Sequence, residues 1–463
     1  MTVTTGVSAA DAEPRRLADP APCVRRVAAR VAARVAEADD AGGSPPDASV
    51  ASVASVASDA PDAARAVAVV IEEFWADAAR RGTPLVEPVD GEPGHRDVTF
   101  LWRGHRATRQ VLLLAEGITD RADLAASLLD PLPGTDIWHL TYRLRADHRG
   151  SYRMAADISP GEPPASAELR LQRLLSLSAH AAPDPLNPLR MQGRWPDRAA
   201  SVYELPPAPA RPGAEPPAGT PRGRVERHRL PAGVLGAERE VWTYLPPGGP
   251  AAELPVLVMC DGDMWFGRLA LQDRLDALIA AGALPPLAVL APDAVDRATR
   301  RREMGEPDAL VRFLADELLP WAAGRWPLTT DPARTLVAGQ GLGGLVCLYA
   351  GFLRPERFGN VLAQSAPLTG TVYGDVSAGP AVDLLRLGSR LGSRLGAGAS
   401  RLPVAVRLDV GLREAEILDH HRELYEMLHS RGCRVTLNEY NGGHDCACWE
   451  AGLTEGLAGL LGH

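Results

Sequence analysis

The sequence lacks the features that would place the protein in a membrane, outside the cell or on nucleic acid. It contains no run of about 18 consecutive apolar residues, which a transmembrane helix requires. The N-terminus does not show the basic-then-apolar order of a secretory signal, because Asp11, Glu13, Arg15 and Arg16 interrupt it. No block of basic residues stands out, and the formal net charge is −9. We therefore expect a cytoplasmic protein whose partners are neither membranes nor nucleic acids.

The sequence also lacks the cysteine patterns of disulfide scaffolds and metal sites. Of its six cysteines, Cys260, Cys347 and Cys433 lie in apolar runs that are typical of buried thiols. Cys446 and Cys448 are closely spaced, but a zinc site would need a second pair of ligands elsewhere. We therefore expect no disulfide framework, no metal centre and no cofactor.

Composition divides the 463 residues into four segments. Residues 1–62 are rich in Ala, Pro and Ser, and we predict a disordered extension with a short helix near 25–38. Residues 63–204 contain strand-like runs separated by Gly, Pro and Asp, a spacing that favours a small β-sandwich-like domain. Residues 205–222 have the composition of a stiff, Pro-rich linker. Residues 223–463 alternate strands and helices, which predicts a doubly wound α/β domain.

The most informative absence is a single serine. The segment Val337-Ala-Gly-Gln-Gly-Leu-Gly-Gly344 has the form of the Gly-x-Ser-x-Gly nucleophile elbow of α/β-hydrolases, but its central residue is Gly341. An apolar run that predicts a buried strand precedes it, and an apolar run that predicts a helix follows it. Gly339 and Gly343 keep the flanks of the turn free of side chains. The sequence therefore predicts an α/β-hydrolase domain with the scaffold for a nucleophile but without the nucleophile.

Chain order places the other members of a hydrolytic triad. His444 follows a predicted strand and a Gly-rich turn near the C-terminus, where α/β-hydrolases carry the general base. An acid is needed to hold this imidazole in the correct tautomer. Glu414, in the loop after a predicted strand, and Asp409, at the end of that strand, are the two candidates.

Several motifs are specific when they occur together in one order. The N-terminal half carries Phe100-Leu-Trp-Arg103, Asp184-Pro-Leu-Asn-Pro188 and Leu205-Pro-Pro-Ala-Pro209. The C-terminal half carries Val256-Leu-Val-Met-Cys-Asp-Gly-Asp-Met-Trp265, Pro355-Glu-Arg-Phe358, Gln364-Ser365, Gly411-Leu-Arg-Glu414 and Gly442-Gly-His-Asp-Cys-Ala-Cys-Trp449. With these motifs, residues 64–463 resemble the enterochelin (ferric enterobactin) esterases.

The resemblance implies hydrolysis of the ester bonds of a ferric catecholate siderophore, a small-molecule partner, so that iron is released inside the cell. It favours Glu414 over Asp409 as the acid, because the family has a carboxylate in that loop. The remaining implied site residues are the oxyanion-hole residues Leu342, Asp263 and Met264 and the substrate-binding residues Arg300, Trp265 and Glu303.

Two departures from the family pattern accompany the missing serine. Pro307 replaces a usual Asn and Ala366-Pro-Leu368 replaces a common aromatic pair, which predicts a changed ligand pocket. Ser365, Cys347 and Cys446 are poor substitutes for the nucleophile, and Ser365, which ends another strand, is expected to be structural. We therefore expect an enterochelin esterase-like protein with weak or absent activity. The alternative is a non-catalytic pseudoenzyme that binds a ferric catecholate siderophore or related ester; the oligomeric state stays open.

Overall fold

The computed structural model describes residues 13–40, 62–160, 164, 166–195, 199–206, 217–249, 253–368 and 404–461. The chain divides into two compact units, one within Val7–Ala208 and the other formed mainly by Pro209–His463. The division falls inside the segment 205–222 that the sequence predicts as a linker, of which residues 207–216 lie outside the described residues. None of the described helices is both long enough and apolar enough to cross a lipid bilayer.

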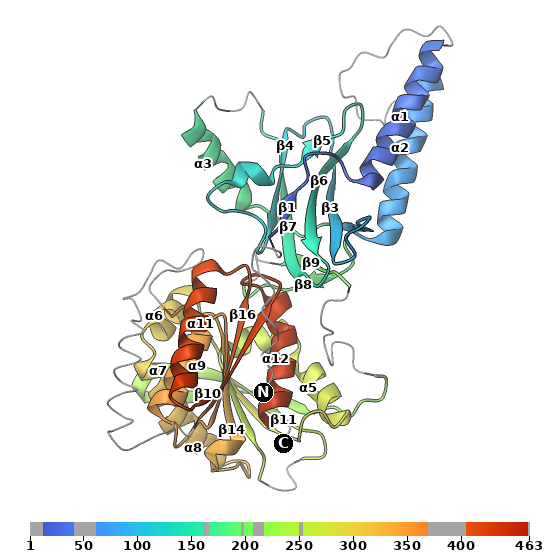
Figure 1. Ribbon diagram of the computed structural model, residues 1–463. Helices are drawn as coiled ribbons and strands as arrows, with labels where there is room; N and C mark the ends of the chain where they lie inside the picture. The colour runs from blue at the N-terminus through green and yellow to red at the C-terminus, as the bar shows by residue number, and fades with distance from the viewer. Residues whose placement is uncertain are drawn as a thin grey trace. The chain divides into compact units, whose positions relative to one another are not determined.

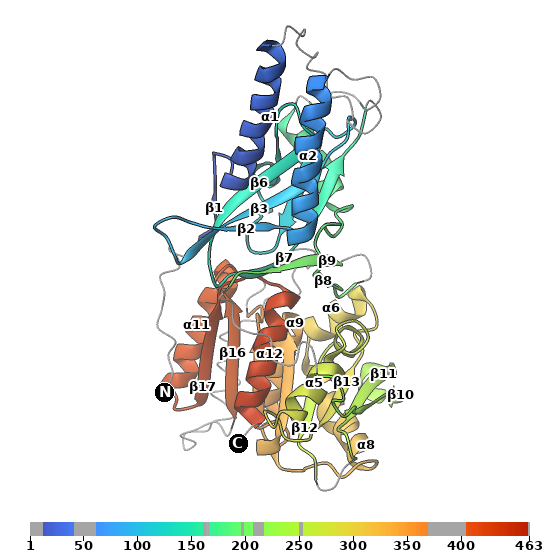
Figure 2. The same cartoon turned by 90° about the vertical axis from the view of Figure 1, so that its right-hand side faces the viewer.

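The N-terminal unit contains two antiparallel sheets (Figures 1 and 2). One has the order β1-β6-β3-β2, with β5 paired to β6, and the other has the order β4-β7-β9-β8. The bounds are β1 Arg15–Arg16, β2 Leu85–Pro88, β3 His95–Arg103, β4 Gln110–Ala115, β5 Asp130–Pro131, β6 Ile137–Arg145, β7 Arg149–Asp157, β8 Arg190–Met191 and β9 Ala200–Glu204, with helix α3 at Ala167–Ser178. Phe100 and Leu140 of the first sheet share one buried core with Val111 and Met154 of the second. This packing confirms the predicted β-sandwich-like domain.

A pair of helices precedes the sandwich in the chain. Helices α1 (Pro22–Asp40) and α2 (Asp62–Arg81) lie side by side in both views (Figures 1 and 2). Val27 of α1 and Ile71 of α2 belong to one buried cluster that also includes residues of the sheet. The short helix predicted near residues 25–38 is present as part of α1, but the disorder predicted for the rest of residues 1–62 is wrong within 13–40, where the chain is folded onto the sheet. The side chains of α1 are small, but its valines recur at helical spacing and form a continuous apolar face that packs on the rest of the unit.

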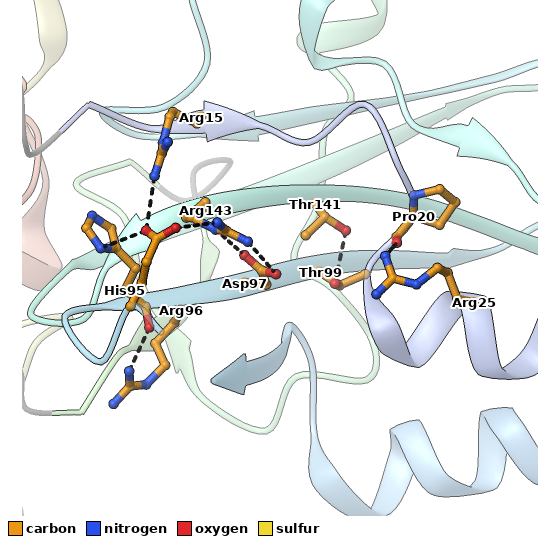
Figure 3. A network of polar contacts seen from close by, with 10 residues as sticks. Arg15, Pro20, Arg25, His95, Arg96, Asp97, Thr99, Thr141 and Arg143 are labelled. Carbon is orange, nitrogen blue, oxygen red and sulfur yellow. Dashed lines mark hydrogen bonds and ion pairs between the residues drawn. The ribbon is translucent and has the colours of Figure 1, made fainter. Parts of the chain in front are cut away.

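Polar contacts attach the beginning of the chain to the sheet. The Cys23 N–H, in the first turn of α1, donates at 2.9 Å to the buried carboxylate of Glu87 on β2. Arg15 of β1 donates at 3.2 Å to Glu92, and Arg143 of β6 donates to the other oxygen of Glu92 at 2.8 Å. Figure 3 shows Arg15 on β1 joined to Arg143 and Asp97 of the neighbouring strands in one network of polar contacts. These bonds explain why a two-residue strand holds its place at the edge of the sheet.

The C-terminal unit is built on one eight-stranded sheet with the order β10-β11-β13-β12-β14-β15-β16-β17. The strands from β13 to β17 are parallel, while β10 and β11 pair antiparallel at one edge. The bounds are β10 Arg224–Ala232, β11 Ala237–Leu245, β12 Val256–Met259, β13 Ala288–Pro292, β14 Thr335–Gln340, β15 Asn360–Gln364, β16 Ala405–Gly411 and β17 Arg434–Tyr440. The central strands are buried along their whole length, as expected when both faces of a parallel sheet are covered.

Helices cover both faces of this sheet (Figure 1). Their bounds are α4 Gly262–Trp265, α5 Leu271–Ala280, α6 Arg297–Gly305, α7 Asp308–Arg312, α8 Leu319–Ala323, α9 Leu342–Leu353, α11 Ala415–Ser430 and α12 Cys446–Leu461, with one π-helical turn, Phe313–Leu318, between α7 and α8. One core lies under α7, α9 and α11 and a second under α5 and α12. This arrangement confirms the predicted α/β-hydrolase domain. The turns after β12, β14, β15, β16 and β17 all leave the carboxyl ends of parallel strands, the edge at which such sheets carry their sites.

Candidate active site

Gly341 forms the turn between β14 and α9. Its backbone has φ +56° and ψ −125°, which glycine adopts at little cost, and its N–H donates to the Gln364 carbonyl oxygen at 2.9 Å. The strand and the helix approach so closely here that a Cβ added to Gly339 would lie 2.4 Å from the carbonyl oxygen of Gly343. The turn therefore has the geometry of a nucleophile elbow, which presents residue 341 at the carboxyl end of the sheet.

His444 faces residue 341 from the turn after β17. A Cβ atom built on Gly341 would lie 3.3 Å from Nε2 and 3.5 Å from Cε1 of the imidazole. Within the described part of the chain, no other residue beyond the two chain neighbours comes within 4 Å of that position. The Trp449 ring packs edge-on against the imidazole, with ring centroids 4.7 Å apart. Nε2 is thus placed to take a proton from a group held at position 341.

Glu414 is the acid that contacts His444. Its Oε2 lies 2.8 Å from Nδ1 of the imidazole, so Nδ1 carries the proton and Nε2 of the neutral ring is the acceptor. The other oxygen, Oε1, accepts from the Ser365 hydroxyl at 2.6 Å, the Gly411 N–H at 2.8 Å and the Tyr440 hydroxyl at 3.1 Å. Burial alone would raise the pKa of this carboxyl. The hydrogen bond and charge of His444, with the bonds from Ser365 and Gly411, lower the pKa below its ordinary value, so the group stays ionised.

Asp409, the alternative acid, has other partners. One carboxylate oxygen accepts from Arg407 Nε at 2.8 Å, and the other accepts from Gln364 Nε2 at 3.0 Å. Burial raises the pKa of this carboxyl, and the positive charge of Arg407 opposes that shift only in part. These bonds hold the Asp409 carboxylate against Arg407 of β16 and Gln364 of β15. Glu414, in contrast, reaches the imidazole from the turn beyond β16.

The predicted oxyanion hole consists of backbone N–H groups at Leu342, Asp263 and Met264. Leu342 and Asp263 lie in the first turns of α9 and α4, where N–H groups have no acceptor within the helix. The Met264 N–H instead donates to the carbonyl oxygen of Asp261 at 3.0 Å. Met264 is therefore excluded as a donor, and the amides of Leu342 and Asp263 remain the candidates.

Arg300 and Glu303, predicted to bind the substrate, are paired inside the protein. Arg300 forms a bidentate pair with Asp261, at 2.6 Å from Nε to Oδ1 and 2.9 Å from Nη2 to Oδ2. Glu303 accepts two bonds of 2.8 Å from Nη2 of Arg239. The two pairs join α6 to the turn after β12 and to β11. They neutralise both charges within the unit, so the geometry does not support a role for either residue as a free substrate ligand.

Trp265 and the two positions that depart from the family pattern are buried. The Trp265 ring has no exposed surface, and its indole N–H donates to Oε1 of Gln340 at 2.9 Å. Pro307 and Ala366 also lie in the interior. A side chain without exposed surface does not contact a ligand in this conformation. Trp265 is therefore a core residue, and the expectation that positions 307 and 366 reshape the ligand pocket is not supported.

Removing the Arg300 guanidinium is expected to destabilise the protein strongly. In Arg300→Ala, the buried carboxylate of Asp261 would lose its bidentate guanidinium, and breaking a buried ion pair costs about 3–5 kcal/mol in the free energy of unfolding. Urea titration followed by circular dichroism measures this. Arg302→Ala on the same helix is the matched control, because its side chain is 68% exposed, and we expect a change within about 0.5 kcal/mol. A loss of only about 1 kcal/mol for Arg300→Ala, the range of an exposed pair, would contradict the buried ion pair.

Sequence reasoning missed three residues that contact the His–Glu pair. Ser365 and Tyr440 donate to Glu414, and Trp449 packs against His444 and donates to Ser365 at 2.8 Å. Ser365 and Trp449 lie in motifs that the sequence analysis singled out, but strand patterns do not show that separate turns converge on one carboxylate.

Comparison with known proteins agrees with this fold. Residues 97–214 match the family model described as enterochelin esterase, N-terminal, and residues 232–460 match the model described as putative esterase. The iron(III) enterobactin esterase of Dickeya dadantii is 34% identical over 412 residues, covering 84% of this chain and 93% of that protein. The iron(III) salmochelin esterase of Escherichia coli is 32% identical over 397 residues, covering 85% of this chain and 94% of that protein.

Crystal structures show the same architecture. The ferric enterobactin esterase of Salmonella typhimurium gives a TM-score of 0.69 at 29% identity and covers 83% of this chain and 98% of its own. The enterobactin esterase of Shigella flexneri, determined in the presence of enterobactin, gives a TM-score of 0.68 at 29% identity and covers 84% of this chain and 97% of its own. Since both units match family models and the similarity extends along nearly the whole length of these relatives, the chain belongs to the enterochelin esterase family.

Proposed function

We propose that this protein binds a ferric catecholate siderophore of the enterobactin type in the cytoplasm and hydrolyses its ester bonds slowly, with Gly341 in place of the nucleophilic serine. The relatives named as iron(III) enterobactin and salmochelin esterases support the substrate class. One observation carries the chemistry. Nε2 of His444 lies 3.3 Å from the Cβ position of residue 341, and Glu414 bonds to Nδ1, the other nitrogen of the same imidazole.

The groups that remain are those of a general base and an oxyanion hole. With no Oγ at Gly341, an acyl-enzyme does not form, so water has to attack the ester carbonyl carbon directly. Nε2 of His444 takes a proton from that water, the carbonyl oxygen gains negative charge near the amides of Leu342 and Asp263, and the imidazolium returns its proton to the departing alkoxide. In a well-studied serine protease, loss of the serine lowers kcat by about 10⁶ and leaves about 10³–10⁴ over water. That magnitude predicts a very weak hydrolase.

The purified protein is expected to hydrolyse ferric enterobactin at well below about 1 s⁻¹, the lower end of usual enzyme turnover. The reason is the missing Oγ at Gly341. Chromatography of the linear trimer, dimer and monomer products under excess substrate measures the rate, and His444→Ala should remove whatever hydrolysis remains. Turnover of about 1 s⁻¹ or faster would show that another nucleophile operates, with Cys446 the first to replace.

Binding without cleavage is a second candidate function. The observation that favours it is that residue 341 is glycine and has no side chain to attack an ester. Titration of the protein with ferric enterobactin, followed by quenching of intrinsic tryptophan fluorescence, measures the dissociation constant. Saturable binding with no product after prolonged incubation would support the binder, whereas product formation that requires His444 would support the weak enzyme.

A further inference from the structure

Ser365 has a strained backbone at a fully buried position. It directly follows β15 and has φ +51°, a region that residues other than glycine rarely occupy and that costs about 1–3 kcal/mol. Its N–H donates at 2.8 Å to the Asp409 carbonyl oxygen, and the next N–H, that of Ala366, donates at 3.3 Å to Nε2 of His421. A glycine would satisfy this turn without strain. The turn alone therefore does not explain why a serine is here.

The Ser365 hydroxyl explains it, because the direction of one of its hydrogen bonds is fixed by the partner. The Trp449 indole N–H, which can only donate, lies 2.8 Å from Oγ, so Oγ is the acceptor of that bond. The hydroxyl proton is then directed to the ionised Glu414 at Oε1, 2.6 Å away, because the Tyr440 hydroxyl oxygen is farther, at 3.1 Å, and uncharged. Trp449, Ser365, Glu414 and His444 thus form one chain of donors and acceptors that ends at Nδ1 of the imidazole.

We infer that Ser365, held by Trp449, is a positioning residue of the His–Glu pair. Its bond, at 2.6 Å, is the shortest of the three that Oε1 of Glu414 accepts, and it holds the carboxylate so that Oε2 faces His444 and the proton stays on Nδ1. The acceptor nitrogen Nε2 is then the one that faces residue 341. The inference rests on the proposed function only in assigning His444 as the base; the tautomer itself does not depend on any substrate.

Nuclear magnetic resonance of the full chain with isotopically labelled histidine tests this, because the shifts of the two ring nitrogens report the tautomer. His444→Ala identifies the signals. In the native protein we expect a single tautomer with the proton on Nδ1. In Ser365→Ala and Ser365→Gly we expect the other tautomer to rise to at least about a tenth of the molecules, beyond the range of an ordinary minor state. Ser365→Gly also relieves the backbone strain, so a role confined to the turn would leave its tautomer native.

Thr454→Val is the matched control. It removes a buried hydroxyl from α12, the helix that carries Trp449, and this hydroxyl donates to the Ala451 carbonyl oxygen at 2.9 Å. We expect no change of tautomer there. Trp449→Phe keeps an aromatic ring at this position but removes the N–H donor to Ser365 together with one ring of the indole, and it should shift the tautomer in the same direction as Ser365→Ala. Native spectra for both Ser365 variants would overturn the inference; if neither variant folds, Trp449→Phe decides it by the same criterion.

A kinetic readout uses the Gly341→Ser background. Adding Ser365→Ala should lower kcat by about 10- to 100-fold, a part of the 10²–10⁴-fold that general acid–base catalysis contributes, and should leave KM unchanged. A change confined to KM would contradict a role through the base. If Gly341→Ser is inert, the proposed function fails, while the tautomer measurement on the native chain still tests Ser365.

Discussion

Replacing Gly341 by serine is expected to raise the rate of ferric enterobactin hydrolysis by at least about 100-fold, a fraction of the roughly 10⁶ that a triad serine contributes elsewhere. The Cβ position of residue 341 lies 3.3 Å from Nε2 of His444. An Oγ bonded to that Cβ can therefore lie at hydrogen-bond distance from Nε2, about 2.6–3.2 Å. The elbow backbone already has the conformation in which such turns carry serine. We expect partial recovery, because a contact of 3.3 Å requires the imidazole to move by a few tenths of an ångström.

Two variants make this result specific. Gly341→Ala adds the Cβ with the same backbone strain but no Oγ, so its turnover should stay at the native level. Gly341→Ser combined with His444→Ala should return to background, because nothing then deprotonates the serine. Product chromatography with ferric enterobactin and with aryl esters measures all of them. A Gly341→Ser protein that folds normally and remains inert toward every ester would show that the site is misplaced or that the substrate no longer fits.

In the Gly341→Ser background, Glu414→Gln is expected to lower kcat by up to about 10⁴-fold, the loss seen when a triad acid becomes an amide and the histidine adopts the wrong tautomer. The substitution keeps the shape of the side chain. However, the Gln amide NH₂ can donate toward Nδ1, which favours the proton on Nε2, and Nε2 then cannot accept a proton from Oγ. Binding of substrate should change little, so the effect belongs in kcat.

Asp409→Asn in the same background separates the two acids. Asp409 pairs with Arg407 and Gln364, so its amide variant should lower the free energy of unfolding while kcat per folded molecule stays close to that of Gly341→Ser. Steady-state kinetics together with urea titration distinguish the two effects. If Asp409→Asn abolished turnover in a folded protein while Glu414→Gln did not, the acid would be Asp409.

Periodicity and turn composition were sufficient to predict the doubly wound domain, the sandwich and the elbow, since each depends on local pattern. They could not choose between Asp409, which lies in β16, and Glu414, which lies in the turn after it. The choice depends on which side chains share a face of β16. Asp409 lies two residues from Arg407 and therefore on the same face, where the two form an ion pair that neutralises both charges. Glu414 lies beyond the strand end, where the turn brings it to His444.

The structure does not support the substrate-binding assignments, and the reason is different. Arg300 and Trp265 stand in motifs at the carboxyl edge of the sheet, but a one-dimensional motif does not reveal whether a side chain faces solvent or the interior. Burial of Trp265 and pairing of Arg300 with Asp261 depend on contacts between segments that are far apart in the sequence. The same limit hid the convergence of Ser365 and Tyr440 on Glu414.

The helices that precede the sandwich bear on where the N-terminal unit can be cut. The match to the family model begins at residue 97, but Val27 and Ile71 share a buried cluster with Leu101 and Ile137 of the sheet. A fragment that starts at the family boundary would leave those sheet residues uncovered in water and would also lose β1 and β2 from the sheet's edges. The match to the family model begins inside the fold, whereas the sheet begins with β1 and its buried core with α1. A stable isolated unit therefore has to include Arg15.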